Sequence, residues 1–294
     1  MLEQVTVAGG GTLGSQIAFQ SAFFGKQVIV YDISEDAIEK ARQRLANLDQ
    51  NYRRDMQATP AQLVETHQRI QLTTVPEQAF SHRDLIIEAV PEVPTIKINL
   101  YKQVATLRAT NSILASNSST FLPSQFADET GAPAQFANLH FANSIWQHNT
   151  AEIMGHAGTS VDTIHQLTEF AKSIQMVPIV LKKEQPGYVL NTMLTPFLEN
   201  AAYLWGAGIV DAPTVDQTWM IGTGAPEGPF GIIDKVGLRT FYSIESQRKG
   251  NDPEYQPILE QLKAMIDRDA LGVETGHGFY DYPDPAYERP DFLV

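Results

Sequence analysis

Short runs of β-branched and apolar residues alternate with amphipathic segments along about the first 180 residues. Between the runs, the spacing of apolar residues predicts three helices. The first follows residues 9–14, the second covers 35–48 after an N-cap at Ser34, and the third covers Lys97–Leu107 after Pro94. This alternation is typical of a doubly wound, mostly parallel sheet. The runs predict strands at Gln4–Val7, Gln27–Tyr31, Arg69–Thr73, Asp84–Val90, Ser112–Ala115, Gln135–Phe141, Ala151–Met154 and Val177–Leu181.

The pattern changes near residue 185. From Tyr188 to Gly208 the apolar residues recur at three- and four-residue steps, which predicts a long amphipathic helix with a possible kink at Pro196. The segments that follow are helix-like near 214–221, 237–248 and 256–269, and no strand-like run appears. We therefore predict an α/β domain over residues 1–184 and a smaller all-helical domain over 185–294.

Composition and charge narrow the class of protein. Apolar residues make up 43% of the 294 residues and charged residues 19%, values typical of a folded globular protein. The formal net charge of −13 disfavours nucleic acid and membrane surfaces as partners. The chain has no cysteine, which excludes disulfides, thiol nucleophiles and cysteine-ligated metals, and we predict no metal site. No signal-peptide pattern or long apolar run is present, so we expect a cytoplasmic protein.

A glycine-rich turn joins the first predicted strand to the first predicted helix. Its spacing, Gly9-x-Gly11-x-x-Gly14, allows a tight turn, close approach of a ligand to the backbone, and close helix packing. A helix N-terminus binds a pyrophosphate through backbone N–H groups and therefore needs no lysine. The alternative is a structural turn without a ligand. The residues expected to contact a dinucleotide here are Gly9, Gly11, Thr12, Leu13 and Gly14.

An acidic residue follows the second strand. Asp32 lies 23 residues after Gly9, where a carboxylate accepts hydrogen bonds from the adenosine ribose. The next residues, 33–36, contain no Arg or Lys for a 2′-phosphate and add two acidic side chains. The sequence therefore predicts NAD rather than NADP as cofactor.

One histidine stands apart from the other six. His140 lies in an apolar predicted strand late in the α/β domain, and Glu152 lies 12 residues further on in another short strand. Adjacent strands can bring the two side chains within hydrogen-bond distance, so that the carboxylate fixes the imidazole tautomer for proton transfer beside a nicotinamide. The alternative interpretation is a histidine that simply belongs to the core.

Further motifs follow one another in a fixed order along the chain. They are Asn117-Ser118-Ser119, Leu139-His140-Phe141-x-Asn143, Pro186-Gly187-Tyr188-Val189-Leu190-Asn191, Gly224-x-Pro226-x-Gly228-Pro229-Phe230 and Thr275-Gly276-x-Gly278-Phe279-Tyr280. Together with the glycine turn, these motifs resemble the 3-hydroxyacyl-CoA dehydrogenase family over nearly the whole sequence. The resemblance implies a Rossmann domain, a helical domain for dimerisation and part of the substrate cleft, a homodimer, and a place in fatty acid metabolism.

The resemblance also implies roles for single residues. His140 would be the catalytic acid/base, Glu152 its partner, and Ser119 and Asn191 would hold the 3-oxygen of the substrate. Glu92, Lys97, Ser119 and Asn143 would contact the cofactor. Plainer alternatives exist: Ser119 can cap a helix, Asn191 can satisfy backbone groups in the domain linker, and Glu92 and Lys97 can form a solvated surface pair.

This chain departs from the family pattern at three places. The loop at 141–149 lacks the usual proline, and by resemblance it should line the acyl pocket. Glu274 stands where the family has a lysine on the cofactor side. The family's coenzyme A contacts, a serine and a lysine, correspond to Leu48 and Asp55. Arg53 and Arg54 beside them are either substitutes or surface residues.

The leading hypothesis is an NAD-dependent enzyme that interconverts a 3-hydroxyacyl-CoA thioester and its 3-ketoacyl form, with His140 as acid/base. The missing coenzyme A contacts keep a dehydrogenase of a free 3-hydroxy acid or sugar acid as the first alternative. A non-catalytic NAD-binding protein is the second, although His140, Glu152, Ser119 and Asn191 are all in place.

Overall fold

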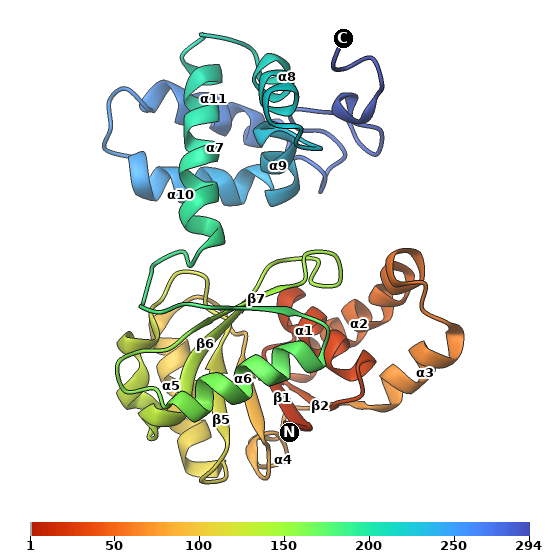
Figure 1. Ribbon diagram of the computed structural model, residues 1–294, viewed down its shortest axis with the longest axis vertical. Helices are drawn as coiled ribbons and strands as arrows, with labels where there is room; N and C mark the ends of the chain where they lie inside the picture. The colour runs from red at the N-terminus through yellow and green to blue at the C-terminus, as the bar shows by residue number, and fades with distance from the viewer. Residues whose placement is uncertain (1) are drawn as a thin grey trace. The chain divides into compact units, whose positions relative to one another are not determined.

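The computed structural model describes residues 2–294 and separates into two compact units, the first ending at Val189 and the second spanning Leu190–Val294. The first unit contains the sheet with its helices, and the second is helical (Figure 1). The two units meet at 189/190, whereas the sequence predicted a boundary at 184/185. Two hydrophobic clusters lie in the first unit and a third in the second, and no cluster contains residues of both units, so each unit has its own packing.

One eight-stranded sheet forms the centre of the first unit, in the order β3-β2-β1-β4-β5-β6-β7-β8. Neighbours from β3 through β6 run parallel, whereas β7 is antiparallel to β6 and β8 is parallel to β7. This confirms the doubly wound, mostly parallel sheet. The strands are β1 (Gln4–Ala8), β2 (Gln27–Tyr31), β3 (Ile70–Thr73), β4 (Leu85–Glu88), β5 (Ile113–Ser116), β6 (Phe136–Phe141), β7 (Thr150–Met154) and β8 (Val177–Val180).

Helices cover both faces of the sheet, as Figure 1 shows. One face packs against α1 (Thr12–Phe23), α2 (Glu35–Met56) and α6 (Val161–Ser173), and the other against α4 (Pro76–Phe80) and α5 (Pro94–Leu107). Strands that are buried on both faces of a sheet have nearly continuous apolar sequences, and the predicted strands of this unit have such sequences. The carboxyl ends of β1, β4, β5 and β6 therefore meet at one open edge, which we call the carboxyl edge.

Two helices of this unit, α4 and α6, were not predicted. The polar stretch after the second predicted helix is helix-prone in sequence, and it forms helix in the structure: α2 continues from residue 48 to Met56, and α3 (Pro60–Gln68) follows. The last turns of α2 are polar, and they are held by tertiary packing: Tyr52 is fully buried, with its ring 4.6 Å from that of Phe19. Tyr52 and Phe19 are far apart in the sequence, so the local pattern of residues cannot predict their contact. Short 3₁₀ turns at Pro123–Gln125, Ala127–Thr130 and Pro133–Gln135 connect β5 to β6.

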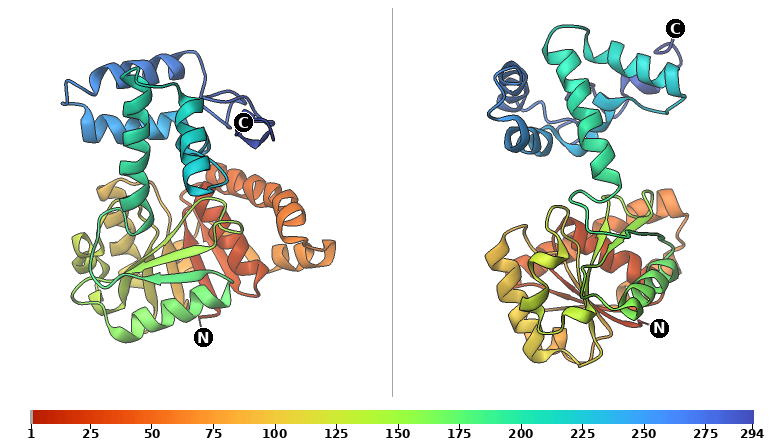
Figure 2. Two further views of the ribbon diagram at one scale, coloured as in Figure 1. Left: turned by 45° about the horizontal axis from the view of Figure 1, so that its top comes forward. Right: turned by 60° about the vertical axis from the view of Figure 1, so that its left-hand side comes forward.

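The second unit is built from helices around its own core (Figure 2). Pro196 lies inside the first of them, and a cluster of buried aromatic and aliphatic residues such as Phe230, Leu238 and Leu262 fills the interior. The elements are α7 (Leu190–Gly206), α8 (Ala212–Thr223), α9 (Pro229–Val236), α10 (Leu238–Lys249), α11 (Gln256–Asp267) and a 3₁₀ turn at Ala286–Glu288.

Two buried carboxylates hold the glycine-rich motifs of this unit together. Asp216 accepts the backbone N–H groups of Phe230 and Gly231 and the hydroxyl of Tyr280, at 2.9–3.0 Å. Asp234 accepts the N–H groups of Phe279 and Tyr280, both at 2.9 Å. Burial raises the pKa of Asp216 to about 6. These motifs therefore serve the packing of the helical unit.

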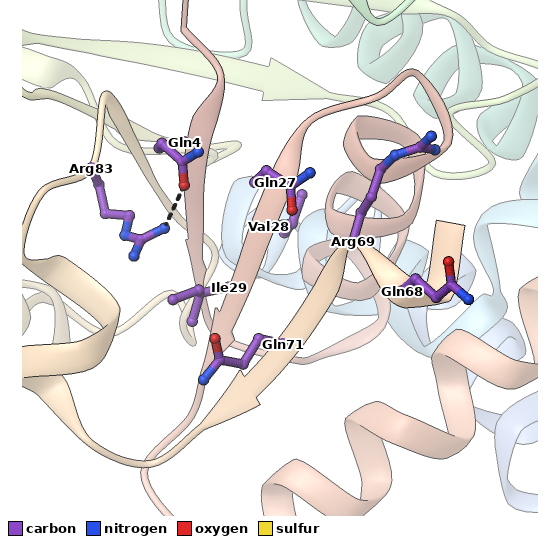
Figure 3. Close-up of a pocket in the computed structure, with 8 residues that line it drawn as sticks. All are labelled: Gln4, Gln27, Val28, Ile29, Gln68, Arg69, Gln71 and Arg83. Atoms are coloured by element: carbon purple, nitrogen blue, oxygen red, sulfur yellow. Dashed lines mark hydrogen bonds between the residues drawn. The ribbon is translucent and has the colours of Figure 1, made fainter. Parts of the chain in front are cut away.

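None of the helices between residues 2 and 294 combines the length and apolar character needed to cross a membrane. A polar hollow of about 310 Å³ lies at the amino ends of β1–β3, where the Arg83 guanidinium donates to Gln4 Oε1 at 3.0 Å (Figure 3). The glycine turn follows the carboxyl end of β1, so this hollow lies at the opposite edge of the sheet.

Candidate active site

Two of the three glycines of the Gly9-x-Gly11-x-x-Gly14 motif leave no room for a side chain. Gly9 has φ of +107°, and a Cβ there would lie 2.5 Å from the carbonyl oxygen of Ala89. A Cβ on Gly14 would lie 1.9 Å from the carbonyl oxygen of Gly9. Nothing lies within 4 Å of a Cβ on Gly11, which leaves open space directly before the first turn of α1. Thr12 is exposed and Leu13 half-buried in that turn, so the geometry fits a pyrophosphate on the helix N-terminus.

Asp32 is held in a fixed position at the end of β2. Its Oδ2 accepts the Gly10 N–H at 2.8 Å, and its Oδ1 accepts the Ile33 N–H at 2.8 Å. The side chain is half-buried, and Glu35 and Asp36 are exposed just beyond it. A carboxylate held beside the turn in this way fits the ribose of NAD, and the neighbouring negative charges oppose a 2′-phosphate.

His140, Glu152 and Ser119 lie together at the carboxyl edge. His140 on β6 pairs directly with Glu152 on β7, and the His140 Nδ1 to Glu152 Oε2 distance is 3.0 Å. His140 Nε2 lies 3.1 Å from the hydroxyl of Ser119, which is exposed. The imidazole and the carboxylate are only 5% and 4% exposed, so their contact is shielded from water. The structure thus brings together three of the four predicted catalytic residues.

Tyr188 supports this group, although sequence reasoning assigned it no role. Its ring stacks on the His140 ring at 4.5 Å and 12°, and its hydroxyl donates to the Ser118 carbonyl at 2.6 Å. The Val189 N–H donates to Glu152 Oε1 at 2.9 Å, so both carboxylate oxygens are bound. Burial raises the pKa of Tyr188, which keeps it a hydroxyl donor. Its only signal in the sequence was its place in the 186–191 motif.

Glu92 and Lys97 belong to a buried network. The Lys97 ammonium contacts Glu88 at 2.7 and 2.9 Å and Glu92 at 2.9 Å, and Lys97 is 1% exposed. Glu88, a residue that sequence reasoning missed, is fully buried and also accepts hydrogen bonds from the hydroxyls of Tyr101 and Ser116. Lys97 is therefore a buried cation between two carboxylates, and the surface-pair alternative does not describe it.

The outer carboxylate of this network binds the segment that carries Ser119. Glu92 accepts hydrogen bonds from the Ser118 hydroxyl and from the Thr120 hydroxyl, the latter at 2.8 Å. Burial opposes ionisation of Glu92, but the hydrogen bond from Ser118 and the charge of Lys97 outweigh it and lower the pKa of Glu92. We infer that Lys97 and Glu92 hold the loop at 117–120, which we call the serine loop, in place. Their direct contact with the cofactor stays a prediction.

The remaining predicted site residues lie on other segments of the chain. Asn143 is exposed in the loop after β6, and Asn191 is half-buried in the first turn of α7, within the helical unit. Their roles stay predictions. Glu274, one of the departures from the family pattern, is exposed in the helical unit.

The atypical loop after β6, residues 142–149, closes onto α2. The Trp146 indole N–H donates to Asp55 Oδ2 at 2.8 Å, and Gln16 Oε1 accepts the Ser144 N–H at 2.9 Å. Arg54 is bidentate to Asp55, at 2.7 and 2.8 Å. Leu48 is only 7% exposed. The two positions where the resemblance implied coenzyme A contacts thus hold a core leucine and a carboxylate bound to the loop.

A doubly wound sheet with a glycine turn on a helix N-terminus and an acidic residue after β2 defines an NAD-dependent oxidoreductase of the Rossmann class. The family model of the 3-hydroxyacyl-CoA dehydrogenase NAD-binding domain matches residues 4–185, and that of the C-terminal domain matches residues 187–282. The chain belongs to this family, whose members act on CH–OH groups with NAD.

Relatives and solved structures agree with this assignment. Human mitochondrial hydroxyacyl-coenzyme A dehydrogenase is 29% identical over 290 residues, covering 96% of this chain and 92% of its own. The structure of an (S)-3-hydroxybutyryl-CoA dehydrogenase from Ralstonia eutropha matches at 28% identity with a TM-score of 0.82, over 97% of this chain and 100% of that one. A diketoreductase structure, described as acting on dicarbonyl compounds, matches at 45% identity with a TM-score of 0.91, over 96% and 99%.

The buried network predicts a specific loss of stability. Lys97→Met leaves the fully buried Glu88 carboxylate without its cation, so we expect the free energy of unfolding to fall by about 3–5 kcal/mol in urea denaturation. The matched control is Lys102→Met on the same helix, because Lys102 forms an exposed pair with Glu129. That change should cost less than about 1 kcal/mol. Equal losses in the two variants would contradict the network.

Proposed function

We propose that this protein interconverts a 3-hydroxy and a 3-oxo group on a small carbonyl substrate with NAD as the redox partner, and that His140 is the acid/base. The observation that carries the proposal is the arrangement at the carboxyl edge, where Ser119, His140 and Glu152 form one hydrogen-bonded chain. The glycine turn and Asp32 lie at the carboxyl ends of β1 and β2 in the same sheet.

In the oxidative direction, His140 Nε2 removes the proton of the substrate hydroxyl. The Glu152 carboxylate binds Nδ1–H, fixes the tautomer that leaves Nε2 as a base, and stabilises the imidazolium that forms. The Ser119 hydroxyl can donate or accept, so it binds the substrate oxygen both as alcohol and as ketone. We include Asn191 as a second ligand of that oxygen. NAD, which the glycine turn and Asp32 would hold, would supply the acceptor for the hydride of the carbinol carbon. In reduction, the imidazolium returns its proton to the oxygen.

Two substrate classes are candidates. The first is a 3-hydroxyacyl-CoA thioester, the class named for most of the relatives, at 28–30% identity. The second is a free dicarbonyl compound, favoured by the 45% identity to the diketoreductase structure and its description. Both classes present a 3-oxo group to the same residues.

His140→Gln tests the mechanism. With NADH and a 3-oxo substrate such as acetoacetyl-CoA or pentane-2,4-dione, we expect the wild-type protein to oxidise the cofactor. The variant should lose a factor of about 10²–10⁴ in kcat, because the proton donor is gone. The Kd for NADH, measured by fluorescence titration, should stay within about threefold, since the imidazole does not hold the dinucleotide.

The matched control is His165→Gln on α6, where the histidine is exposed. It should turn over at the wild-type rate. Unchanged turnover in His140→Gln would refute the proposed acid/base. NADH binding without turnover on any 3-oxo compound would favour a non-catalytic NAD-binding protein.

We also propose a homodimer formed through the helical unit. Apolar side chains are exposed on α7 and α8, among them Met193 at 63% and Ile221 at 64%. Phe197 and Trp219 join the two helices, with ring centroids 4.4 Å apart. An exposed apolar surface of this kind marks a protein interface.

Light scattering tests the dimer. We expect a mass about twice 32.6 kDa for the wild type and a shift toward the monomer for Met193→Lys combined with Ile221→Lys, since buried charge opposes association. Val161→Lys, at an apolar residue that is 87% exposed on α6, is the control and should leave the mass unchanged. A monomeric wild-type protein would exclude the proposal.

A further inference from the structure

Resting on the proposed function, we infer that the substrate is a free 3-oxo carbonyl compound without a coenzyme A tail, and that Asp55 and Trp146 are specificity-determining residues for this choice. The inference concerns the loop at 142–149 and the last turn of α2 that it contacts, where the resemblance implied the coenzyme A contacts; we call this region the mouth.

The loop begins two residues after His140 and is fixed by several contacts. Ile145 is fully buried, and Trp146 is 8% exposed with its ring centroid 5.6 Å from that of Tyr52. Gln16 Oε1 accepts the N–H groups of Ser144 and Ile145. With the Trp146 to Asp55 hydrogen bond, these contacts hold the loop against the end of α2. The mouth, which begins two residues after His140, is therefore held in a defined conformation.

The charge at this mouth is negative where a phosphate-bearing tail would need a cation. The hydrogen bond from Arg54 lowers the pKa of Asp55, burial opposes it, and the Trp146 N–H lowers it further, so Asp55 is ionised at neutral pH. The Arg54 guanidinium donates two hydrogen bonds to the Asp55 carboxylate, so its charge is already paired. Arg54 therefore does not offer the free cation that the sequence allowed.

Most other basic residues of the first unit either form ion pairs or lie on segments away from the loop at 142–149. Of its fourteen basic residues, eight form ion pairs with carboxylates among the described residues. Arg83 and Arg108 precede β4 and β5 at the opposite edge of the sheet, and Lys182 and Lys183 follow β8 in the segment that leads to Tyr188. On α2, Arg44 donates to the Gly10 carbonyl at 3.2 Å, beside the cofactor turn. Arg53 remains as the cation near the loop.

Coenzyme A carries several phosphate charges, and proteins usually bind phosphates with arginine and lysine clusters. One exposed arginine next to an ionised aspartate is a poor site for such a tail. The helical unit is acidic overall, with seven basic and sixteen acidic residues. A free dicarbonyl compound has no phosphates to bind, and the residues proposed for its reacting oxygen, Ser119, His140 and Asn191, do not depend on a nucleotide tail.

The experiment compares three 3-oxo substrates with NADH: acetoacetyl-CoA, the N-acetylcysteamine thioester of acetoacetate, and pentane-2,4-dione. The two thioesters share the reacting group and differ in the nucleotide tail. We expect their kcat/KM values to agree within about threefold, and the value for pentane-2,4-dione to be at least as high. A tenfold or greater advantage of acetoacetyl-CoA over the short thioester would overturn the inference and leave the proposed function standing. No NADH oxidation with any of the three would refute both.

Asp55→Asn tests the specificity-determining residue. The amide oxygen still accepts the Trp146 N–H, but the charge is lost and Arg54 is released. We expect the ratio of kcat/KM for acetoacetyl-CoA to that for the short thioester to rise at least fivefold. The control, Asp162→Asn, removes an exposed charge from the start of α6 and should leave the ratio unchanged. A ratio in Asp55→Asn that equals the control's would exclude Asp55 from this role.

Discussion

The pairing of β6 with β7 is the constraint on which the proposed catalytic group, His140 with Glu152 and Ser119, depends. In an antiparallel pair, directly opposed residues lie on the same face with their Cβ atoms close together, and His140 is opposed to Glu152. A register shift by one residue would turn the carboxylate to the other face of the sheet. The loop at 142–149 connects the two strands, so its contacts with Gln16 and Asp55 also secure this register.

A second layer of contacts holds the pair in place. Tyr188 covers the imidazole, and the backbone N–H of Val189 occupies the second carboxylate oxygen. On the other side, Lys97 and Glu92 fix the serine loop from the interior of the sheet. A buried charge pair is costly unless its groups are fully hydrogen-bonded, and here each carboxylate has several donors. The catalytic geometry is thus built into the core rather than into mobile surface chains.

Much of this could be predicted from the sequence. Apolar runs gave the strands, glycine spacing with Asp32 gave the cofactor, and the position of His140 and Glu152 in two short strands gave the pair, because these signals are local or periodic. The roles of Glu88 and Tyr188 could not be predicted, since they depend on contacts between distant segments. The charge at the mouth could not be predicted from the sequence either, because only the structure shows that the Arg54 guanidinium is paired with the Asp55 carboxylate.

The central claim is that Glu152 fixes the tautomer of His140 so that Nε2 faces Ser119 as the base. Nitrogen NMR of ¹⁵N-histidine-labelled protein, with His140 assigned by comparison with His140→Gln, measures this directly. In the neutral ring we predict the proton on Nδ1 and a free lone pair on Nε2, and we expect Glu152→Ala to lose this preference. A neutral ring protonated at Nε2 in the wild-type protein would contradict the account.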